Sequence, residues 1–168
     1  IVSLKKNKIN VKAAIITDYA GHPSDWKKIN WLSKKYKFLT INDNCHSFGS
    51  KYYKQKNYAA KYASIATHSF HPVKAITTGE GGSIITNNKK INENVKLLRS
   101  HGIVKNKFLD RKNGLWFYQM NKLGFNYRLA DILCSLGTSQ LKKINFFLKE
   151  RKKIENFYNE SFVDKSIF

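Results

Sequence analysis

The pattern that most constrains this chain is a short apolar run, a helix and a second apolar run within its first 43 residues. Residues 13–18 (AAIITD) are rich in β-branched side chains and end in a turn with a glycine and a proline, which is typical of a buried strand and its exit loop. Ser24 or Asp25 can cap the helix that follows, and residues 38–43 (FLTIND) form a second strand. A strand, a helix and a strand at this spacing make a βαβ unit. We therefore expect an α/β fold, with a parallel sheet and helices on its faces.

The rest of the chain continues this alternation. Two more short strands are predicted, at residues 64–69 (SIATHS) and 82–86 (GSIIT). Apolar residues at helical intervals predict an amphipathic helix over 89–100. A long helix is predicted over 129–157, with a break near Gly137. The stretch 105–124 is polar and aromatic without a steady period, so it is predicted to be a loop, of a length often found in lids and binding loops.

The net charge of +20 by itself favours a nucleic-acid or other anionic partner. However, only four of the 31 basic residues are arginine, and the lysines are scattered along the chain beside many asparagines and isoleucines. A nucleic-acid-binding protein more often gathers its charge in one stripe and uses arginine for bidentate contacts. A compositional drift explains the charge, so we expect no nucleic-acid partner. The charge can still attract a substrate that carries phosphates.

The sequence also bears on location and metal binding. No apolar run approaches the ~20 residues of a membrane helix, and the first residues (IVSLKK) lack the apolar stretch of a signal peptide. We expect a soluble, cytoplasmic protein without a membrane partner. Cys45 and Cys134 lie far apart and have no metal-ligand spacing, so two free thiols and no metal site are expected.

Polar and glycine-rich clusters follow the predicted strands, where open α/β sheets bind ligands. They lie at residues 43–49, 69–82 and 124–128. Lys74 follows a strand and precedes a glycine run, and a desolvated lysine there could attack a carbonyl, although a single surface lysine is the simpler reading. The glycine run could cradle a phosphate, but one such run is a weak signal. Asp43 could be a helix cap, a metal ligand or the partner of a buried cation, and spacing alone does not choose among these.

Taken together, long segments of the chain resemble the DegT/DnrJ/EryC1/StrS family of sugar aminotransferases, which depend on pyridoxal 5′-phosphate (PLP). The segments TDYAGHPSD, NDNCHSFGSKY, SFHPVKAITTGEGGSIITNN, LLRSHGI and KLGFNYRLADILCSLGTSQLKKI occur in the family's order and at its spacing, across residues 13–158. The resemblance implies a three-layer α/β/α sandwich like the large domain of fold-type I PLP aminotransferases. Residues 1–168 are then expected to be a part of this domain truncated at both ends. The family's N-terminal segment and C-terminal small domain are expected to be absent, so activity of these residues alone is not expected.

The resemblance also assigns roles to residues around the PLP ring. Lys74 aligns with the lysine that holds PLP in a Schiff base and later moves a proton. Asp43 aligns with the carboxylate that pairs with the pyridinium nitrogen and so keeps it protonated. His46 matches the position that contacts the ring hydroxyl. Cys45 matches a small residue packed on the ring face, where alanine is more usual.

Further residues are expected at the cofactor phosphate. Ser69 aligns with a hydroxyl that binds it, and Asn126 aligns with an asparagine that reaches it from the neighbouring subunit, which implies a homodimer with a shared active site. His71, Glu80 and Arg128 lie inside the matching motifs, and their roles stay open between catalytic and structural.

The implied reaction transfers an amino group, usually from glutamate, to a keto group of a nucleotide-linked deoxysugar. Within the family, DYAGHPSD and SFHPVKAITTGEGG are most similar to enzymes that aminate C4 of a UDP-linked 4-keto-6-deoxy-N-acetylhexosamine on the way to pseudaminic acid. One alternative is a PLP-dependent sugar dehydratase, but in such relatives a histidine replaces the lysine, so Lys74 argues against it. The other alternative is an inactive basic fragment that binds anionic ligands through its charge.

Overall fold

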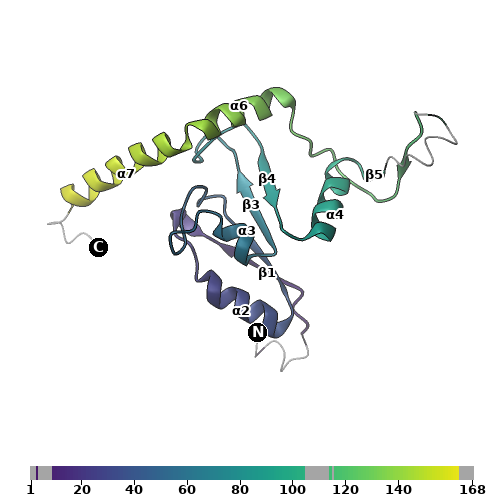
Figure 1. Cartoon of the computed structure of the whole chain (residues 1–168), viewed down its shortest axis with the longest axis horizontal. Helices are drawn as coiled ribbons and strands as arrows, with labels where there is room; N and C mark the ends of the chain where they lie inside the picture. The colour runs from purple at the N-terminus through teal and green to yellow at the C-terminus, as the bar shows by residue number, and fades with distance from the viewer. Residues whose placement is uncertain (1–2, 4–8, 105–113, 115, 163–168) are drawn as a thin grey trace.

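The computed structural model describes residues 3, 9–104, 114 and 116–162, and it is built on a four-stranded sheet (Figure 1). In the order in which they pair, the strands are β1 (Ala13–Thr17), β2 (Leu39–Asp43), β3 (Ile65–Ser69) and β4 (Gly82–Ile85). The first three are parallel, and β4 is antiparallel to β3. All four predicted strands are confirmed, but the sheet is mixed rather than parallel throughout, because the loop from β3 to β4 contains no crossover helix.

Two helices of the first half, α2 (Trp26–Tyr36) and α4 (Lys89–Arg99), begin where the sequence predicts. The short α3 (Tyr58–Tyr62) was not predicted, and a 3₁₀ turn, η1, covers Tyr19–Gly21. Asp25 is the N-cap of α2, since its carboxylate accepts the backbone N–H of Lys28 at 3.3 Å. Asn88 caps α4 in the same way, accepting the N–H of Ile91 at 3.0 Å.

The C-terminal region contains two helices, α6 (Asp131–Lys142) and α7 (Ile144–Ser161), which run along the top of Figure 1. The predicted break near Gly137 is wrong, because the helices meet at Lys143 and Gly137 lies inside α6. A Cβ at Gly137 would lie 2.7 Å from Cγ2 of Thr78. This glycine therefore lets α6 approach the loop after β3 instead of interrupting the helix.

Part of the predicted loop 105–124 lies outside the described residues. In the described part, β6 (Gln119–Met120) pairs antiparallel with β5 (Ile103–Val104) beside α4, beyond the β4 edge of the sheet. A strand therefore replaces some of the expected loop. No helix among the described residues is both long and apolar enough to cross a membrane.

Helices α2 and α3 cover one face of the sheet. The core on this face consists of Trp26, Tyr58, Ala59, Ala63 and Ala66. The opposite face carries the alternate residues of each strand. On that face Ile15 is 71% exposed, Leu39 49% and Ile84 50%. The class is α/β, as expected, with one layer of helices described on the covered face.

A fully buried aspartate, Asp18, ties the carboxyl ends of the first two strands to both covering helices. Its carboxylate accepts hydrogen bonds at 2.7–3.1 Å from the Ser24 N–H, the Trp26 indole, the Asn42 and Asn44 amides and the Tyr58 hydroxyl. Its backbone N–H donates to the carbonyl of Asp43, and its carbonyl accepts the hydroxyl of Ser47. The donors come from β2, from the residue after it, from the turn before α2, from α2 and from α3. One side chain therefore fixes the positions of all these segments.

A histidine on the covered face has a pKa that is set by its burial. His68 is in β3, its Nδ1 is 3.1 Å from the hydroxyl of Ser83, and its ring meets Phe48 edge-on at 4.9 Å. Burial lowers the pKa of His68 below its ordinary value of 6.5. The folded protein therefore holds this imidazole neutral near pH 7.

We expect Asp18→Asn to lower the free energy of unfolding by about 2–4 kcal/mol, because an amide would turn N–H groups toward buried donors and leave them unpaired. Urea denaturation of the intact gene product measures this loss. Asp25→Asn is the matched control, since asparagine caps a helix as well as aspartate and Asp25 is exposed. Equal losses in the two variants would contradict the central role of Asp18.

We expect the stability of the folded state to fall as the pH decreases below about 6.5. The unfolded chain protonates His68 at its ordinary pKa, whereas the folded chain, with its lowered pKa, resists the proton. The stability is fully present above that pH and is lost as the pH falls toward the folded-state pKa. Urea midpoints between about pH 5.5 and pH 7.5 should depend less on pH in His68→Gln than in the wild type. His22→Gln, which changes an exposed histidine, serves as the control, and an unchanged slope in His68→Gln would disprove the prediction.

Candidate functional site

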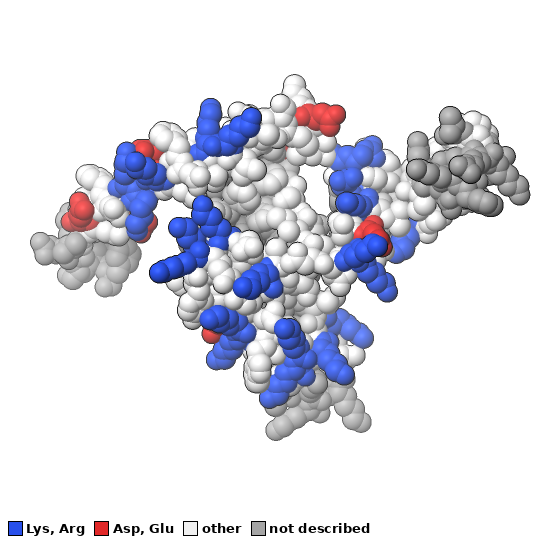
Figure 2. All heavy atoms as spheres, in the orientation of Figure 1, with Lys and Arg blue, Asp and Glu red and all other residues white. Residues whose placement is uncertain are grey.

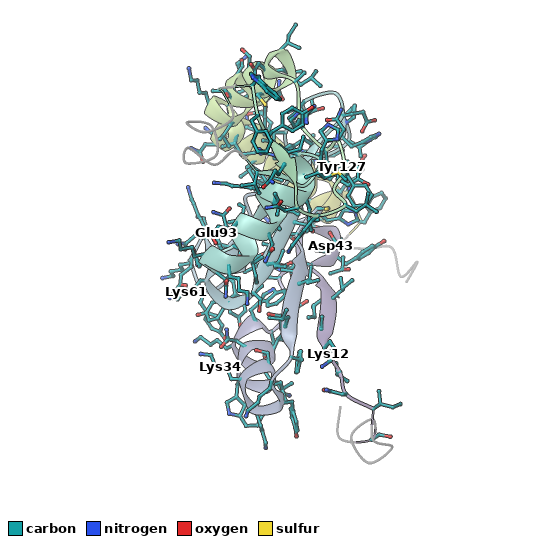
Figure 3. The ribbon with its side chains drawn as sticks, turned by 90° about the vertical axis from the view of Figure 1, so that its right-hand side faces the viewer. Lys12, Lys34, Asp43, Lys61, Glu93 and Tyr127 are labelled. Atoms are coloured by element: carbon teal, nitrogen blue, oxygen red, sulfur yellow. The ribbon has the colours of Figure 1, made fainter. Side chains whose placement is uncertain are left out.

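All the candidate residues except Asn126 lie at or just after the carboxyl ends of the parallel strands β2 and β3, the edge at which α/β sheets bind ligands. Asp43 ends β2, and the register places it between Thr17 of β1 and Thr67 of β3. Ser69 ends β3. Figure 3 shows Asp43 at the opposite end of the sheet from Lys12, which precedes β1.

Asp43 is held as a charged carboxylate. Its Oδ1 accepts the backbone N–H of Cys45 at 3.2 Å. The pKa of Asp43 is lowered, chiefly by the hydrogen bond from the Cys45 side chain, then by the Cys45 backbone N–H and the charges of His46 and Lys74, while partial burial opposes the shift. Lys74 lies in the loop that leaves β3 at the same strand ends as Asp43, and its charge is the smallest of these contributions. The expected amine and the expected anion therefore lie at the same end of the sheet.

Lys74 lies near the tip of the loop formed by residues 70–81, here called the Lys74 loop. Hydrogen bonds close its base: the Phe70 carbonyl accepts the N–H of Thr78 at 3.0 Å and the hydroxyl of Thr77 at 2.9 Å, and the Phe70 N–H donates to Gly81 at 2.8 Å. The N–H of Lys74 donates to the carbonyl of His71 at 3.0 Å. Hydrogen bonds thus hold the backbone on both sides of Lys74, and its side chain is half-buried.

The glycine run of this loop returns the chain into β4. Gly81 has a φ of +143°, a conformation that side-chain-bearing residues rarely adopt, and a Cβ at Gly82 would lie 2.5 Å from the carbonyl of His68. Glycine at these positions therefore lets β4 pair closely with β3, where Gly82 lies opposite Ser69.

Cys45 and His46 surround the Asp43 carboxylate. Burial, and then the hydrogen bond to Asp43, raise the pKa of the Cys45 thiol, so it is neutral near pH 7. Nδ1 of His46 accepts the backbone N–H of Ala20 at 3.4 Å, and its ring is 5.5 Å from that of Tyr19. In the neutral ring this leaves the proton on Nε2, as a donor.

Ser69 and the motif residues next to it lie at the base of the Lys74 loop. The hydroxyl oxygen of Ser69 accepts the N–H of His71 at 3.4 Å, so its own proton can still be donated to a ligand. His71 and Glu80 face each other across the loop, with Nε2 and Oε1 4.0 Å apart, and both are exposed. This separation describes a weak surface pair that spans the loop.

Asn126 lies away from this group. It bridges to Ser100 at the end of α4, and its neighbours Phe125 and Tyr127 stack with ring centres 4.8 Å apart. Figure 1 shows α4 and β5 beyond β4, whereas Asp43 ends β2. Asn126 and Arg128 are both exposed. Within the described chain, Asn126 therefore does not join the residues around Lys74.

Several residues that support the site were missed by the sequence analysis. Asp18 and Ser47 hold the strand ends, Tyr19 contacts His46, and the guanidinium of Arg151 donates to the carbonyl of Lys74 at 3.1 Å. A buried aspartate at the end of an apolar run was the available signal for Asp18. Nothing local in the sequence indicates Arg151, because its partner is 77 residues away.

Chemically, the site combines a primary amine, an ionised carboxylate, a neutral thiol and a hydroxyl with a free proton. The amine can attack a carbonyl, the carboxylate can hold a cation, and the hydroxyl can bind an anionic oxygen. Within the described ranges, no group of three or more His, Cys, Asp and Glu side chains is placed to hold a metal ion.

Comparisons with known proteins identify relatives of this chain. The sequence profile of the DegT/DnrJ/EryC1/StrS aminotransferase family matches residues 4–168. The UDP-4-amino-4,6-dideoxy-N-acetyl-beta-L-altrosamine transaminase of Campylobacter jejuni subsp. jejuni serotype O:2 is 41% identical over 165 residues, which are 98% of this chain and 42% of that protein. The chain thus spans about two fifths of the length of this relative.

Solved structures share its fold. Helicobacter pylori PseC, an aminotransferase involved in the biosynthesis of pseudoaminic acid, is 35% identical with a TM-score of 0.84, over 92% of this chain and 39% of that one. The putative sugar aminotransferase Spr1654 of Streptococcus pneumoniae, solved in its PLP form, is 26% identical with a TM-score of 0.79, over 96% of this chain and 44% of that one.

Proposed function

We propose the function of this protein from its family, because the chain belongs to the DegT/DnrJ/EryC1/StrS aminotransferase family. The protein transfers an amino group to a nucleotide-linked sugar. The observation that carries this proposal is that the Lys74 loop leaves β3 at the ends of the parallel strands, where Asp43 is held as a carboxylate. An amine and a fixed anion are the two groups that an aminotransferase needs around its cofactor.

The cofactor is PLP, and the residues present fit it. When bound, PLP supplies an electron-withdrawing ring that accepts the electron pair released when a proton leaves the substrate carbon. Asp43 can hold a protonated ring nitrogen, because its lowered pKa keeps it charged. Lys74 provides the amine that attaches the cofactor, and its Nζ afterwards carries the proton.

The remaining residues fix the ring and its phosphate. The Nε2–H of His46 is a donor for the ring hydroxyl, and Cys45 offers a small neutral side chain against the ring face. Ser69 donates its free hydroxyl proton to the phosphate. A fixed ring matters because proton transfer requires the donor and acceptor atoms in one geometry.

For the substrate, we propose a UDP-linked 4-keto-6-deoxy-N-acetylhexosamine that is aminated at C4, with glutamate as the donor. The names of the Campylobacter and Helicobacter relatives support this choice. The dehydratase alternative is less consistent with the site. Such enzymes lack the lysine, whereas Lys74 is present here and hydrogen bonds hold its backbone. A panel of UDP- and TDP-linked keto sugars separates these alternatives, because a dehydratase would release water without forming an amino sugar.

We also propose that the active protein is a homodimer in which Asn126 reaches the phosphate bound by Ser69 of the other subunit. Its support is that Asn126 is exposed and lies apart from Ser69 within one chain. The segment around it also exposes large apolar side chains, among them Met120, Leu123 and Tyr127, as subunit interfaces do before association.

We expect borohydride reduction of the intact gene product with PLP, followed by peptide mapping, to place a pyridoxyl label on Lys74. The reason is that Lys74 lies in the loop after β3, at the same strand ends as Asp43. Lys74→Arg should abolish the label and amino-sugar formation. Lys12→Arg, at the other end of the sheet, should change neither. A label on another lysine, with Lys74 unmodified, would disprove the assignment.

We expect mixed dimers of Lys74→Ala and Asn126→Ala chains to recover activity that neither variant has alone. In such a dimer one of the two sites combines Lys74 from one chain with Asn126 from the other, so a quarter to a half of the wild-type rate is the order of magnitude expected. Co-expression with two affinity tags isolates the mixed dimer for assay. Mixed dimers without activity would contradict a shared site.

A further inference from the structure

The carbonyl of Lys74 is the point at which the C-terminal helix contacts the Lys74 loop. Nη2 of Arg151, in α7, donates a hydrogen bond to this carbonyl at 3.1 Å. A charged donor makes a stronger hydrogen bond than a neutral one. The backbone of Lys74 is thus held on both sides, since its N–H donates to His71.

The same face of α7 contacts the second loop of the site. Leu148 precedes Arg151 by three residues and so lies next to it on the helix surface. A Cβ on Gly49 would lie 2.7 Å from Cδ1 of Leu148, which shows how closely α7 packs against residues 44–50. This segment carries Cys45 and His46. One helical face therefore contacts both loops that carry the candidate cofactor residues.

The charged residues next to Arg151 pair within the helix. Lys152 binds Glu155 at 2.6 Å, and Lys153 binds Glu150 at 2.8 Å, both as neighbours three residues apart. Arg151 instead contacts a loop 77 residues away in sequence. Its role is therefore distinct from the general charge of α7.

We infer that Arg151 is a positioning residue for Lys74: its guanidinium holds the Lys74 backbone and so restricts where the amine can lie. This inference rests on the proposed function, because the position of the amine matters for attaching the cofactor. Arg151 acts through the carbonyl of Lys74. Without it, the tip of the loop would sample more positions, and the amine would spend less time in the one that attaches the cofactor.

The test compares Arg151→Met with Lys152→Met in the intact gene product. Both variants remove one positive charge from the exposed surface of α7 and keep a good helix former. Hydrogen–deuterium exchange without cofactor measures how often the Lys74 loop opens. The rate at which PLP attaches to Lys74, trapped by borohydride reduction, measures how well the amine is positioned. Arg151→Met should raise exchange in residues 70–81 about three- to tenfold, as expected for the loss of one hydrogen bond, and slow labelling by a similar factor.

Three further results complete the test. Exchange in α4 and the thermal midpoint should stay unchanged in Arg151→Met, and Arg151→Lys should recover part of the labelling rate. Unchanged exchange and labelling in Arg151→Met, or equal effects in Lys152→Met, would overturn the inference. A wild-type protein without label on Lys74 would contradict the proposed function, whereas a labelled wild type with an unaffected Arg151→Met would contradict the inference alone.

Discussion

The carboxylate of Asp18 joins the ends of β1 and β2 to both helices on the covered face. It accepts hydrogen bonds from five residues, which lie in β2, just after β2, just before α2, in α2 and in α3. A charge at 0% exposure is tolerated only when it is satisfied in this way. Because the donors of Asp18 include Asn42 and Asn44, its network fixes the backbone on both sides of Asp43. The position of the candidate cofactor carboxylate is therefore set by a buried neighbour whose own oxygens are occupied by hydrogen bonds.

The two aspartates at the strand ends also show why one of them suits a ligand and the other does not. A carboxylate has about four sites at which it can accept hydrogen bonds, and the Asp18 network already occupies them. Asp43 accepts one backbone N–H and interacts with the thiol of Cys45, so it keeps accepting capacity toward the open side of the sheet. Both residues end an apolar run and are followed by a turn. The difference between them arises from long-range donors that the sequence pattern does not reveal.

Local pattern predicted the elements well, and long-range packing explains what it missed. Short apolar runs predicted all four strands, the capping residues Ser24 and Asp25 predicted the start of α2, and apolar residues at helical intervals predicted α4. Gly137 was read as a helix break because glycine is a poor helix former, but its role depends on Thr78, which is 59 positions earlier. The antiparallel direction of β4 follows from a loop without a helix. At the site, motif resemblance predicted Lys74, Asp43, Cys45, His46 and Ser69 as cofactor residues, which stays a prediction. Arg151 could be found only from the contact of α7 with the Lys74 loop.

The net positive charge of the chain and the single negative charge of Asp43 have different effects on ligands. Figure 2 shows lysine and arginine side chains spread over the visible face rather than gathered in one patch. With 31 basic and 11 acidic residues, the chain as a whole attracts anionic ligands without selecting among them. Selection requires a charge in a fixed position. At the strand ends that charge is Asp43, whose carboxylate is opposite in sign to the protein around it, so it can retain a cationic ring nitrogen within a surface that otherwise repels cations.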